Sequence, residues 1–400
     1  MAKMQYHTIG EYQELLRKSG LLFETKTEGS SDQVIRILTY NSKEAGEDTL
    51  FICKGAAFKP AYLREAVEKG AVCYISEKAF ELEKDIPYIL VTDIRKAMAI
   101  LANFFYQEPW KELVVTGIGG TKGKSTSAYY MKAVVDDYME AQGKKESAVI
   151  SSIDIYDGVT KVESHITTPE AMELQQHLRN ALDSQITYAE MEVSSQALKY
   201  HRVDGMRFDV GIFLNISEDH ISPIEHEDFE DYFSSKMLMF AQTDTAVVNL
   251  DADHIERILE EAKAAKACVT FSLKNPEADY YGYNIRKDGH ETTFSVKSKD
   301  FDEEFVLTMP GLFNVENALG VIAAASALQI PREYIHSGLK RARSSGRMEL
   351  YASKDKNVIA IVDYAHNKLS FEKLFSSMKE EYPDYGIVSI FGCPGKKAYI

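Results

Sequence analysis

The run from Thr116 to Thr126 holds the residues whose types and spacing are best suited to chemistry. It follows a short apolar run, Leu113 to Val115, and precedes a helical pattern from Ser127 to Tyr138, which together predict a strand, a glycine-rich loop and a helix. A loop of this kind turns backbone N–H groups toward an anion at the N-terminus of the helix. Lys124 would then reach the outer phosphates of a nucleotide, and the Ser125 hydroxyl would ligate Mg²⁺.

The glycine spacing in this loop departs from the general phosphate-loop pattern. That pattern would place its first glycine at position 118, where the chain has Ile118. A narrower class of nucleotide-binding loops has a shorter form, which the chain matches with Gly120, Thr121, Lys122, Gly123, Lys124 and Ser125. The alternative is a glycine-rich turn with a chance lysine. We predict that the loop, together with Thr126, binds nucleotide phosphates.

Two polar side chains follow predicted strands and are candidates for holding a metal ion. Glu192 ends a run that begins at Thr187, and its carboxylate suits Mg²⁺, although a solvated or salt-bridged glutamate is the alternative. His220 comes after the run Phe208 to Leu214 and offers an imidazole nitrogen, which the neighbouring Asp219 is able to orient. Isolated histidines are more often structural or exposed, but the position of His220 favours a metal role.

Three further candidates have equally plausible structural roles. Lys236 falls on a helical pattern from Phe229 to Phe240, where the residues alone indicate a lysine that snorkels from an apolar face. The sequence Thr167 to Glu170 predicts a helix N-terminus with Pro169 at the first helical position, and its hydroxyls would hold an anion or cap the helix. Arg202 is suited to pair with a carboxylate or phosphate.

The C-terminal third of the chain offers three candidates for contact with a nucleotide. Asn317 precedes an alanine-rich helical pattern from Ala318 to Leu328, so it would either read an adenine edge or cap that helix. Arg347 and Asp363 lie on the two sides of a predicted strand, Val358 to Val362. Both would reach ATP if this last segment closes over the cleft.

The elements that must position these residues fall into three predicted domains, at 1–107, 108–341 and 342–400, with the first joint at Gln107 to Trp110. The first segment alternates helical patterns with strand patterns; the helices are Gly10–Lys18, Lys59–Lys69 and Ile94–Tyr106, and the strands are Val34–Thr39, Leu50–Ile52, Val72–Ile75 and Tyr88–Val91. Such alternation predicts an α/β fold.

The central segment has strand patterns that are each followed by polar residues, at Ala148–Ser151, Thr187–Met191, Phe208–Leu214 and Ala246–Asn249. Ligands bind at the carboxyl ends of parallel strands in open α/β sheets, so we expect the candidates to meet there. The last segment predicts a helix at Phe371–Glu380 and a second strand at Ile387–Phe391. Two strands and one helix cannot bury both faces of a sheet, so we expect the chain to stop within its last domain.

Composition excludes several classes of protein. The chain has 400 residues, 45% of them hydrophobic and 27% charged, and a formal charge of −15, which argues against general nucleic-acid binding. No run approaches the roughly 18 uninterrupted apolar residues of a membrane span. Cys53, Cys73, Cys268 and Cys393 are scattered, which suggests neither a zinc site nor a disulfide framework, and a cytoplasmic location is the simplest expectation.

Taken together, the motifs resemble those of the Mur ligase family, in the family's order and over nearly the whole chain. The shared motifs are Gly120–Ser125, Thr167–Pro169, Met191–Ser195, Asn215–His220, Lys236, Phe313–Asn317, Gly346–Glu349 and Asp363–Asn367. The resemblance implies a three-domain α/β architecture. It comprises a small N-terminal uridine-binding domain, a central P-loop ATPase-like domain and a C-terminal Rossmann-like domain that is incomplete in this chain.

The resemblance also implies roles for individual residues. Lys124, Glu192, His220 and Lys236 would be catalytic. The ATP-binding residues would be Gly120 to Thr126, Asn317, Arg347 and Asp363. Ser42 would contact the UDP portion of the substrate, and Thr167, Thr168, Ser194 and Arg202 would hold its dipeptide portion. Mg²⁺ would be held by Ser125, Glu192 and His220, and Lys236 would be carboxylated by CO₂ to a carbamate.

Within the family, Thr39–Lys43 and Asp48–Phe51 are similar to the branch that adds the third amino acid to the peptidoglycan precursor UDP-MurNAc-L-Ala-D-Glu. That similarity implies an ATP-dependent ligase that works through an acyl phosphate, as a monomer, without a nucleic-acid or membrane partner. Lys54–Lys59, Lys122, Ser195–Gln196 and Asp219–His226 look most like lysine-adding enzymes of Gram-positive cocci. The amino acid is thus expected to be L-lysine. The alternatives are meso-diaminopimelate, another amide ligase with the same core, such as a folylpolyglutamate or cyanophycin synthetase, or a non-catalytic nucleotide-binding relative.

Overall fold

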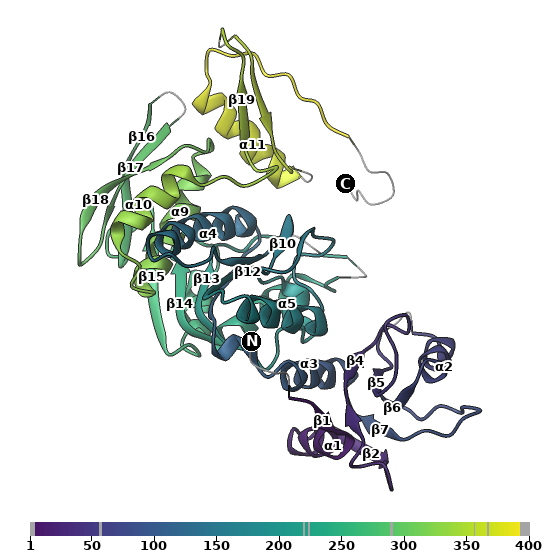
Figure 1. The fold of residues 1–400 in the computed structure, drawn as a ribbon. Helices are drawn as coiled ribbons and strands as arrows, with labels where there is room; N and C mark the ends of the chain where they lie inside the picture. The colour runs from purple at the N-terminus through teal and green to yellow at the C-terminus, as the bar shows by residue number, and fades with distance from the viewer. Residues whose placement is uncertain are drawn as a thin grey trace.

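The computed structural model describes residues 5–55, 58–218, 221–222, 225–288, 291–355, 357–365 and 368–392. Three groups of elements follow one another through the molecule (Figure 1), with the N-terminal group in purple at one end and the last segment in yellow at the other. The fold is mixed α/β, as predicted. The exact domain limits at 107/108 and 341/342 stay a prediction.

The N-terminal group is a five-stranded sheet with helices beside it. Its strands, in spatial order, are β2 (Leu22–Lys26), β7 (Tyr88–Val91), β6 (Ala71–Ser76), β5 (Thr49–Ile52) and β4 (Ile37–Thr39). A separate pair is formed by β1 (His7–Thr8) and β3 (Val34–Ile35), and the helices are α1 (Ile9–Lys18), α2 (Pro60–Glu68) and α3 (Ile94–Phe105). Neighbouring strands run parallel except for β2 against β7.

The central group is built on an 11-stranded sheet. Its strands, in spatial order, are β11 (Lys161–Glu163), β10 (Asp154–Tyr156), β9 (Ala148–Ile150), β12 (Tyr188–Glu192), β8 (Val114–Gly119), β13 (Phe208–Phe213), β14 (Thr243–Asn249), β15 (Ala267–Ser272), β16 (Tyr280–Asp288), β17 (Glu291–Lys297) and β18 (Asp302–Leu307). Pairing is parallel from β9 through β16 and antiparallel at both margins. The parallel part confirms the expectation that the candidate residues follow strands whose carboxyl ends share one edge.

Helices cover this sheet and connect it to the last segment. They are η1 (Pro109–Lys111), α4 (Lys124–Ala141), α5 (Ala171–Asp183), α6 (Ser195–Lys199), α7 (Phe229–Ala241), α8 (Ile255–Ala262), α9 (Phe313–Ala327) and α10 (Arg332–Arg341). The last segment contains a hairpin of β19 (Glu349–Ala352) and β20 (Ile359–Val362), followed by α11 (Lys368–Glu381). No helix in the described part of the chain is both long and apolar enough to cross a membrane.

Three details of the predicted elements are wrong. Residues 387–391 are not a strand, and Ile390 is 94% exposed; β20 pairs with β19, which was not predicted. Helix α5 begins at Ala171, since Glu170 still has an extended backbone, so Pro169 lies before the helix. Helix α9 begins at Phe313, which places Asn317 inside the helix rather than at its cap.

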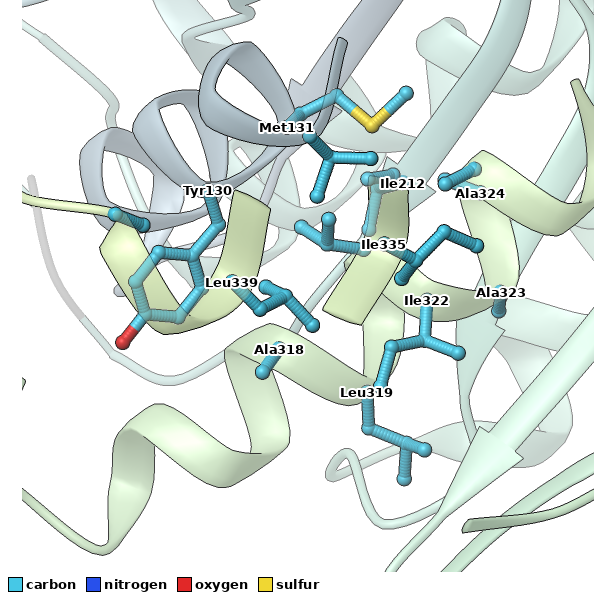
Figure 2. Packing of buried hydrophobic residues seen from close by; sticks show 14 of the residues in the cluster. Tyr130, Met131, Ile212, Ala318, Leu319, Ile322, Ala323, Ala324, Ile335 and Leu339 are labelled. Carbon is cyan, nitrogen blue, oxygen red and sulfur yellow. The ribbon is translucent and has the colours of Figure 1, made fainter. Parts of the chain in front are cut away.

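The phosphate-loop helix α4 is packed on α9 and α10, and the side chains between them form the largest part of the central core (Figure 2). Tyr130 and Met131 of α4 meet Ile335 and Leu339 of α10, and all four are completely or almost completely buried. The two helices touch backbone to backbone at Gly338, where an added Cβ would lie 2.4 Å from the Cα of Val134. That contact fixes the position of α4 and therefore of the loop that precedes it.

We predict that Gly338→Ala destabilises the protein despite the better helix propensity of alanine, which by itself favours the variant by about 1 kcal/mol. The new methyl group would force α4 and α10 apart and should cost about 1–3 kcal/mol net, measured by urea denaturation. Lys340→Ala, at an exposed position of the same helix, should change stability by less than about 0.5 kcal/mol. Equal stability of Gly338→Ala and wild type would contradict the close contact.

Candidate active site

The loop between β8 and α4 has the geometry of an anion-binding loop. Helix α4 begins at Lys124, directly after Gly123, whose φ of 89° is in the left-handed region that favours glycine. A Cβ at that position would also lie 2.2 Å from Oδ1 of Asn317 in α9. Asn215, which follows β13, holds the loop from the other side: its side chain accepts from Lys122 N at 2.9 Å and donates to Lys122 O at 3.1 Å.

Two lysine ammonium groups converge on one carbonyl oxygen of this loop. Lys124 Nζ donates to Gly120 O at 3.0 Å, and Lys236 Nζ of α7 donates to the same oxygen at 2.8 Å. The snorkelling interpretation of Lys236 is therefore wrong: the residue is only 3% exposed and its Nζ lies 4.8 Å from the ring centroid of Tyr232. No local pattern in the chain indicates this contact, because residues 120 and 236 meet only through the packing of α7.

A cavity of about 330 Å³ opens beside the loop, at the carboxyl end of the parallel strands. It brings together the predicted residues Thr121, Lys122, Gly123, Lys124, Ser125, Thr126, Thr167, Glu192, Asn317, Arg347 and Asp363. Its walls come from the central sheet, the first turn of α9 and the last segment. Residues more than 200 positions apart thus line one cavity, as the sequence analysis expected.

The metal candidates Glu192 and Ser125 lie on the same side of this cavity and are linked through Ser152. Glu192 Oε1 accepts from Ser152 N at 2.8 Å and from Ser152 Oγ at 3.0 Å, and Ser125 Oγ is 3.0 Å from Ser152 Oγ. His220 lies outside the described residues, as does Asp219. In the described part of the chain no cluster of three His, Cys, Asp or Glu side chains is placed to hold a metal ion.

These oxygen donors nevertheless fit Mg²⁺. That ion prefers hard oxygen ligands and is usually held by one or two carboxylates together with water and substrate phosphate oxygens, rather than by a cage of protein groups. Glu192 supplies a buried carboxylate, and Ser125 supplies a hydroxyl in the first turn of α4, next to the site of the phosphates. A hydroxyl and a carboxylate beside a phosphate loop are a suitable partial ligand set.

The residues expected to hold a dipeptide form a connected group next to Glu192. Thr168 Oγ1 donates to Glu192 O at 2.9 Å and accepts from Ser194 N at 3.1 Å. Arg202 donates to Thr168 O at 3.2 Å and pairs with Glu170 at 3.0 Å. The threonine hydroxyl thus ties two loops together instead of capping α5.

Glu170 also links the central group to the N-terminal group. Its carboxylate lies 2.6 Å from Nζ of Lys54, which follows β5. Although burial alone would raise the pKa of Glu170, the hydrogen bond from Lys54 and the charges of Arg202 and Lys54 hold it below its ordinary value. Glu170 therefore stays ionised at neutral pH, and its pair with Lys54 joins the two groups beside the cavity.

Ser42 is the one described candidate that the structure places well apart from this cavity. It follows β4 in the N-terminal group, and its hydroxyl donates to Glu65 of α2 at 2.7 Å. Lys69 donates to its carbonyl oxygen at 2.9 Å. A substrate that touched both Ser42 and the cavity would have to extend across the contact between the two groups.

The last segment contributes the roof of the cavity. Arg347 donates to Ser125 Oγ at 3.3 Å, and its guanidinium lies 4.6 Å from the ring centroid of Tyr364. Asp363 accepts from Met348 N at 3.0 Å and from Ala365 N at 2.9 Å, so it orders the turn that carries Arg347. Both residues therefore line the cavity, and their contact with ATP stays a prediction.

Several residues that line the cavity were not candidates by themselves, among them Ser152, Asn215, Phe313, Glu316, Tyr364 and Lys373. Asn215, Phe313, Glu316 and Tyr364 belong to motifs that were recognised, so their neighbours were the available signal. Glu316 is partly buried, and loss of solvent around its carboxyl raises the pKa of that group, which also accepts a hydrogen bond from Asn249. Lys373 stands on α11, and only the placement of that helix over the cavity reveals it.

Comparison with known proteins gives matches along most of the chain. Residues 118–325 match the Mur ligase middle domain, and residues 346–399 match the Mur ligase glutamate ligase domain. The UDP-N-acetylmuramoyl-L-alanyl-D-glutamate–L-lysine ligase of Streptococcus pneumoniae (serotype 2, strain D39) is 35% identical over 395 residues, which are 96% of this chain and 77% of that protein.

Solved structures share the fold. A UDP-N-acetylmuramoyl-L-alanyl-D-glutamate–2,6-diaminopimelate ligase matches with a TM-score of 0.76 at 21% identity, over 94% of this chain and 74% of that chain. The MurF ligase of Thermotoga maritima in complex with ADP matches with a TM-score of 0.59 at 19% identity, over 86% of this chain and 74% of that one. The family models match the phosphate loop and the segments that line the cavity, and the sequence identity extends over nearly the whole chain. The chain therefore belongs to the Mur ligase family.

Proposed function

We propose that the protein is an ATP-dependent ligase that joins L-lysine to UDP-MurNAc-L-Ala-D-Glu, and so adds the third amino acid of the peptidoglycan precursor peptide. The observation that carries the proposal is the single cavity in which a phosphate loop, Glu192, Arg347 and Asp363 meet beside the group of Thr168, Ser194 and Arg202. The pneumococcal relative, which carries the name of a lysine ligase, supports the choice of amino acid.

The nucleotide would lie with its phosphates against the loop and its nucleoside toward α9 and α11. Backbone N–H groups at the start of α4 and the Lys124 ammonium suit the phosphates. The opposite side, at Glu192 and Thr167, leads to the proposed dipeptide group, so the nucleoside extends the other way, past Asn317 and Lys373. Binding of ADP by the MurF ligase of the same fold is consistent with this arrangement.

The ligase reaction would proceed in two steps. A carboxylate oxygen of the D-Glu side chain attacks the γ-phosphorus of ATP, the bond to the ADP oxygen breaks, and an acyl phosphate forms. The α-amine of lysine then attacks the acyl carbon, the C–N bond forms, phosphate leaves with the former C–O bond electrons, and the amine loses a proton. Positioning and neutralisation of phosphate charge are the main demands on the protein in such reactions.

The residues of the cavity meet those demands. Lys124 neutralises charge on the transferring phosphoryl group, and Arg347 adds a second cation from the roof. Arg202 holds a substrate carboxylate, as its fork geometry allows. Ser125 and Glu192, with His220 as the third proposed ligand, would hold Mg²⁺, which supplies additional positive charge at the phosphates when bound.

Carboxylation of Lys236 would relieve an unfavourable pair of charges. Lys236 and Lys124 each lie within 3.0 Å of Gly120 O, so their ammonium groups are at most about 6 Å apart in a largely buried site, where like charges repel strongly. The neutral amine of Lys236 attacks CO₂, a C–N bond forms, and the proton leaves to solvent. The product is an anion next to Lys124 and the proposed metal site.

The proposed activity is tested by phosphate release from ATP in the presence of UDP-MurNAc-L-Ala-D-Glu. We expect release that depends on both this substrate and an amino acid, with L-lysine giving the higher kcat/KM and meso-diaminopimelate a much lower one. A preference for meso-diaminopimelate would reverse the amino-acid assignment. Turnover with a folate substrate and none with the UDP-dipeptide would overturn the function itself.

Lys124→Ala should reduce kcat by at least about a thousandfold, because one preorganised cation at the phosphoryl group typically contributes on this scale. Equilibrium binding of UDP-MurNAc-L-Ala-D-Glu should change little, since that substrate contacts other residues. Lys144→Ala removes the same charge at an exposed site after α4 and serves as the matched control. Comparable rates for Lys124→Ala and wild type would rule out the assigned role.

The carbamate on Lys236 should be visible by ¹³C NMR after equilibration with ¹³C-bicarbonate. We expect one carbamate resonance in wild type and in Lys144→Ala, and none in Lys236→Ala, which should also lose most of its ligase activity. Added short-chain carboxylic acids should restore part of that activity by supplying the missing anion. A fully active Lys236→Ala variant, or a wild-type spectrum without the resonance, would refute the modification.

A further inference from the structure

A buried chain of hydrogen bonds connects Ser195, His226 and Asp231 next to the cavity. His226 Nε2 is 2.9 Å from Ser195 Oγ, and His226 Nδ1 is 3.0 Å from Asp231 Oδ2. His226 is completely buried and Ser195 is 4% exposed. The distances match those of a serine nucleophile with its base and orienting acid.

The burial of Ser195 argues against a nucleophile. An attacking hydroxyl must come within about 3–3.5 Å of a substrate carbonyl carbon. Ser195 is the first residue of α6, its hydroxyl faces His226, and it is absent from the described lining of the main cavity. A carbonyl group could reach this hydroxyl only if the packing of α6 against α7 were opened.

The protonation state of His226 follows from its surroundings. Burial lowers the pKa of His226, the Asp231 carboxylate opposes that shift, and the charges of Lys199 and Lys236 add to the lowering. The ring is therefore neutral at pH 7. Its Nδ1–H donates to Asp231, and its Nε2 accepts from the Ser195 hydroxyl.

These contacts join two elements that carry separate parts of the active site. Helix α6 directly follows Glu192 and Ser194, whereas Asp231 lies in the first turn of α7. Lys199, at the end of α6, adds a second connection, because its Nζ lies 2.5 Å from Asp231 Oδ2. We call Ser195, Lys199, His226 and Asp231 the α6–α7 clasp.

Beyond the clasp, α7 is hydrogen-bonded directly to the phosphate loop. The Tyr232 hydroxyl is 2.9 Å from Thr121 Oγ1, and Lys236 donates to Gly120 O at 2.8 Å. The ring of Tyr232 also packs edge-on against His226, with ring centroids 5.2 Å apart. One helix thus contacts the clasp at its start and the phosphate loop along its next turns.

The clasp also holds the backbone of the segment that leads into α7. Ser222 N donates to His226 O at 3.1 Å, and Lys199 Nζ donates to Glu225 O at 3.3 Å. His226 therefore fixes this segment through its backbone as well as through both ring nitrogens. In the sequence, the proposed metal ligand His220 lies two residues before Ser222.

We propose that His226 is a positioning residue for the ligase reaction: through the α6–α7 clasp it sets α7 against the β12–α6 segment, and so places Lys236 relative to Glu192 and the phosphate loop. The inference rests on the proposed function for its kinetic consequences. Its structural content, the coupling of α7 to α6 through a neutral imidazole, does not depend on turnover.

The test compares His226→Ala with His226→Asn, whose amide retains a donor near the position of Nδ1 and preserves the bond to Asp231. We expect His226→Ala to lower kcat about 10- to 100-fold, as loss of a supporting hydrogen bond at an active site typically does, with KM for ATP and for the UDP-dipeptide nearly unchanged. His226→Asn should recover a substantial part of the rate. The matched control is His336→Ala, which should keep wild-type kcat. His336 is a partly exposed histidine of α10, and it pairs with Glu303 of β18.

Amide hydrogen exchange supplies a readout that requires no turnover. His226→Ala should increase exchange in residues 229–241 and leave the N-terminal sheet unchanged, whereas His226→Asn should stay close to wild type. Unchanged exchange in α7, or wild-type kcat in a folded His226→Ala protein, would overturn the proposal. If wild type shows no UDP-dipeptide-dependent phosphate release, the proposed function fails, while the exchange data still decide the clasp.

A variant of Ser195 distinguishes a positioning role of the clasp from a nucleophilic triad. Ser195→Ala leaves both contacts of Asp231 with His226 and Lys199, so it should cost less activity than His226→Ala. A fluorophosphonate probe should leave Ser195 unlabelled. Labelling of Ser195 that requires His226, together with equal loss of activity in the two alanine variants, would replace the positioning role with covalent catalysis.

Discussion

The carbonyl oxygen of Gly120 is the point on which the site depends. It accepts hydrogen bonds from Lys124 of its own loop and from Lys236 of α7, so one backbone group sets the positions of two cations. Such a contact is possible only because the loop is held from outside, by Asn215 on one side and Asn317 on the other. Gly123 is required between them, since a side chain there would displace Asn317.

The rigid support of the loop comes from apolar packing rather than from the polar site. Helix α4 packs on the sheet beside α9 and against α10, and its contact with α10 is close enough to require glycine at position 338. A packed interior transmits displacement because it has few voids, so a shift of α4 would move Lys124 and Ser125 directly. The apolar core and the phosphate site therefore move together. The last segment covers the phosphate site with polar residues.

Some strands could be predicted from the sequence and others could not, for physical reasons. Strands β5, β7 and β13 are short, mostly apolar runs, and they were recognised nearly to the residue, as was β12, which also contains two glutamates. The antiparallel margins β10, β11 and β16–β18 were missed, because they are exposed on one side and rich in polar residues. The apolar run at 387–391 has the composition of a strand, yet a strand forms only where a partner pairs with it, and in the described part of the chain these residues pair with no strand.

The kind of chemistry could be recognised before the fold was known, because the strand, glycine turn, lysine and helix of an anion-binding loop are contiguous in the chain. Which distant groups serve that loop depends on how the elements pack. It buried Lys236 against Gly120, moved Ser42 away from the cavity, and enclosed His226 between two helices. Those outcomes depend on the order of strands in the sheet and on side-chain packing between elements, and neither is encoded in the spacing of nearby residues.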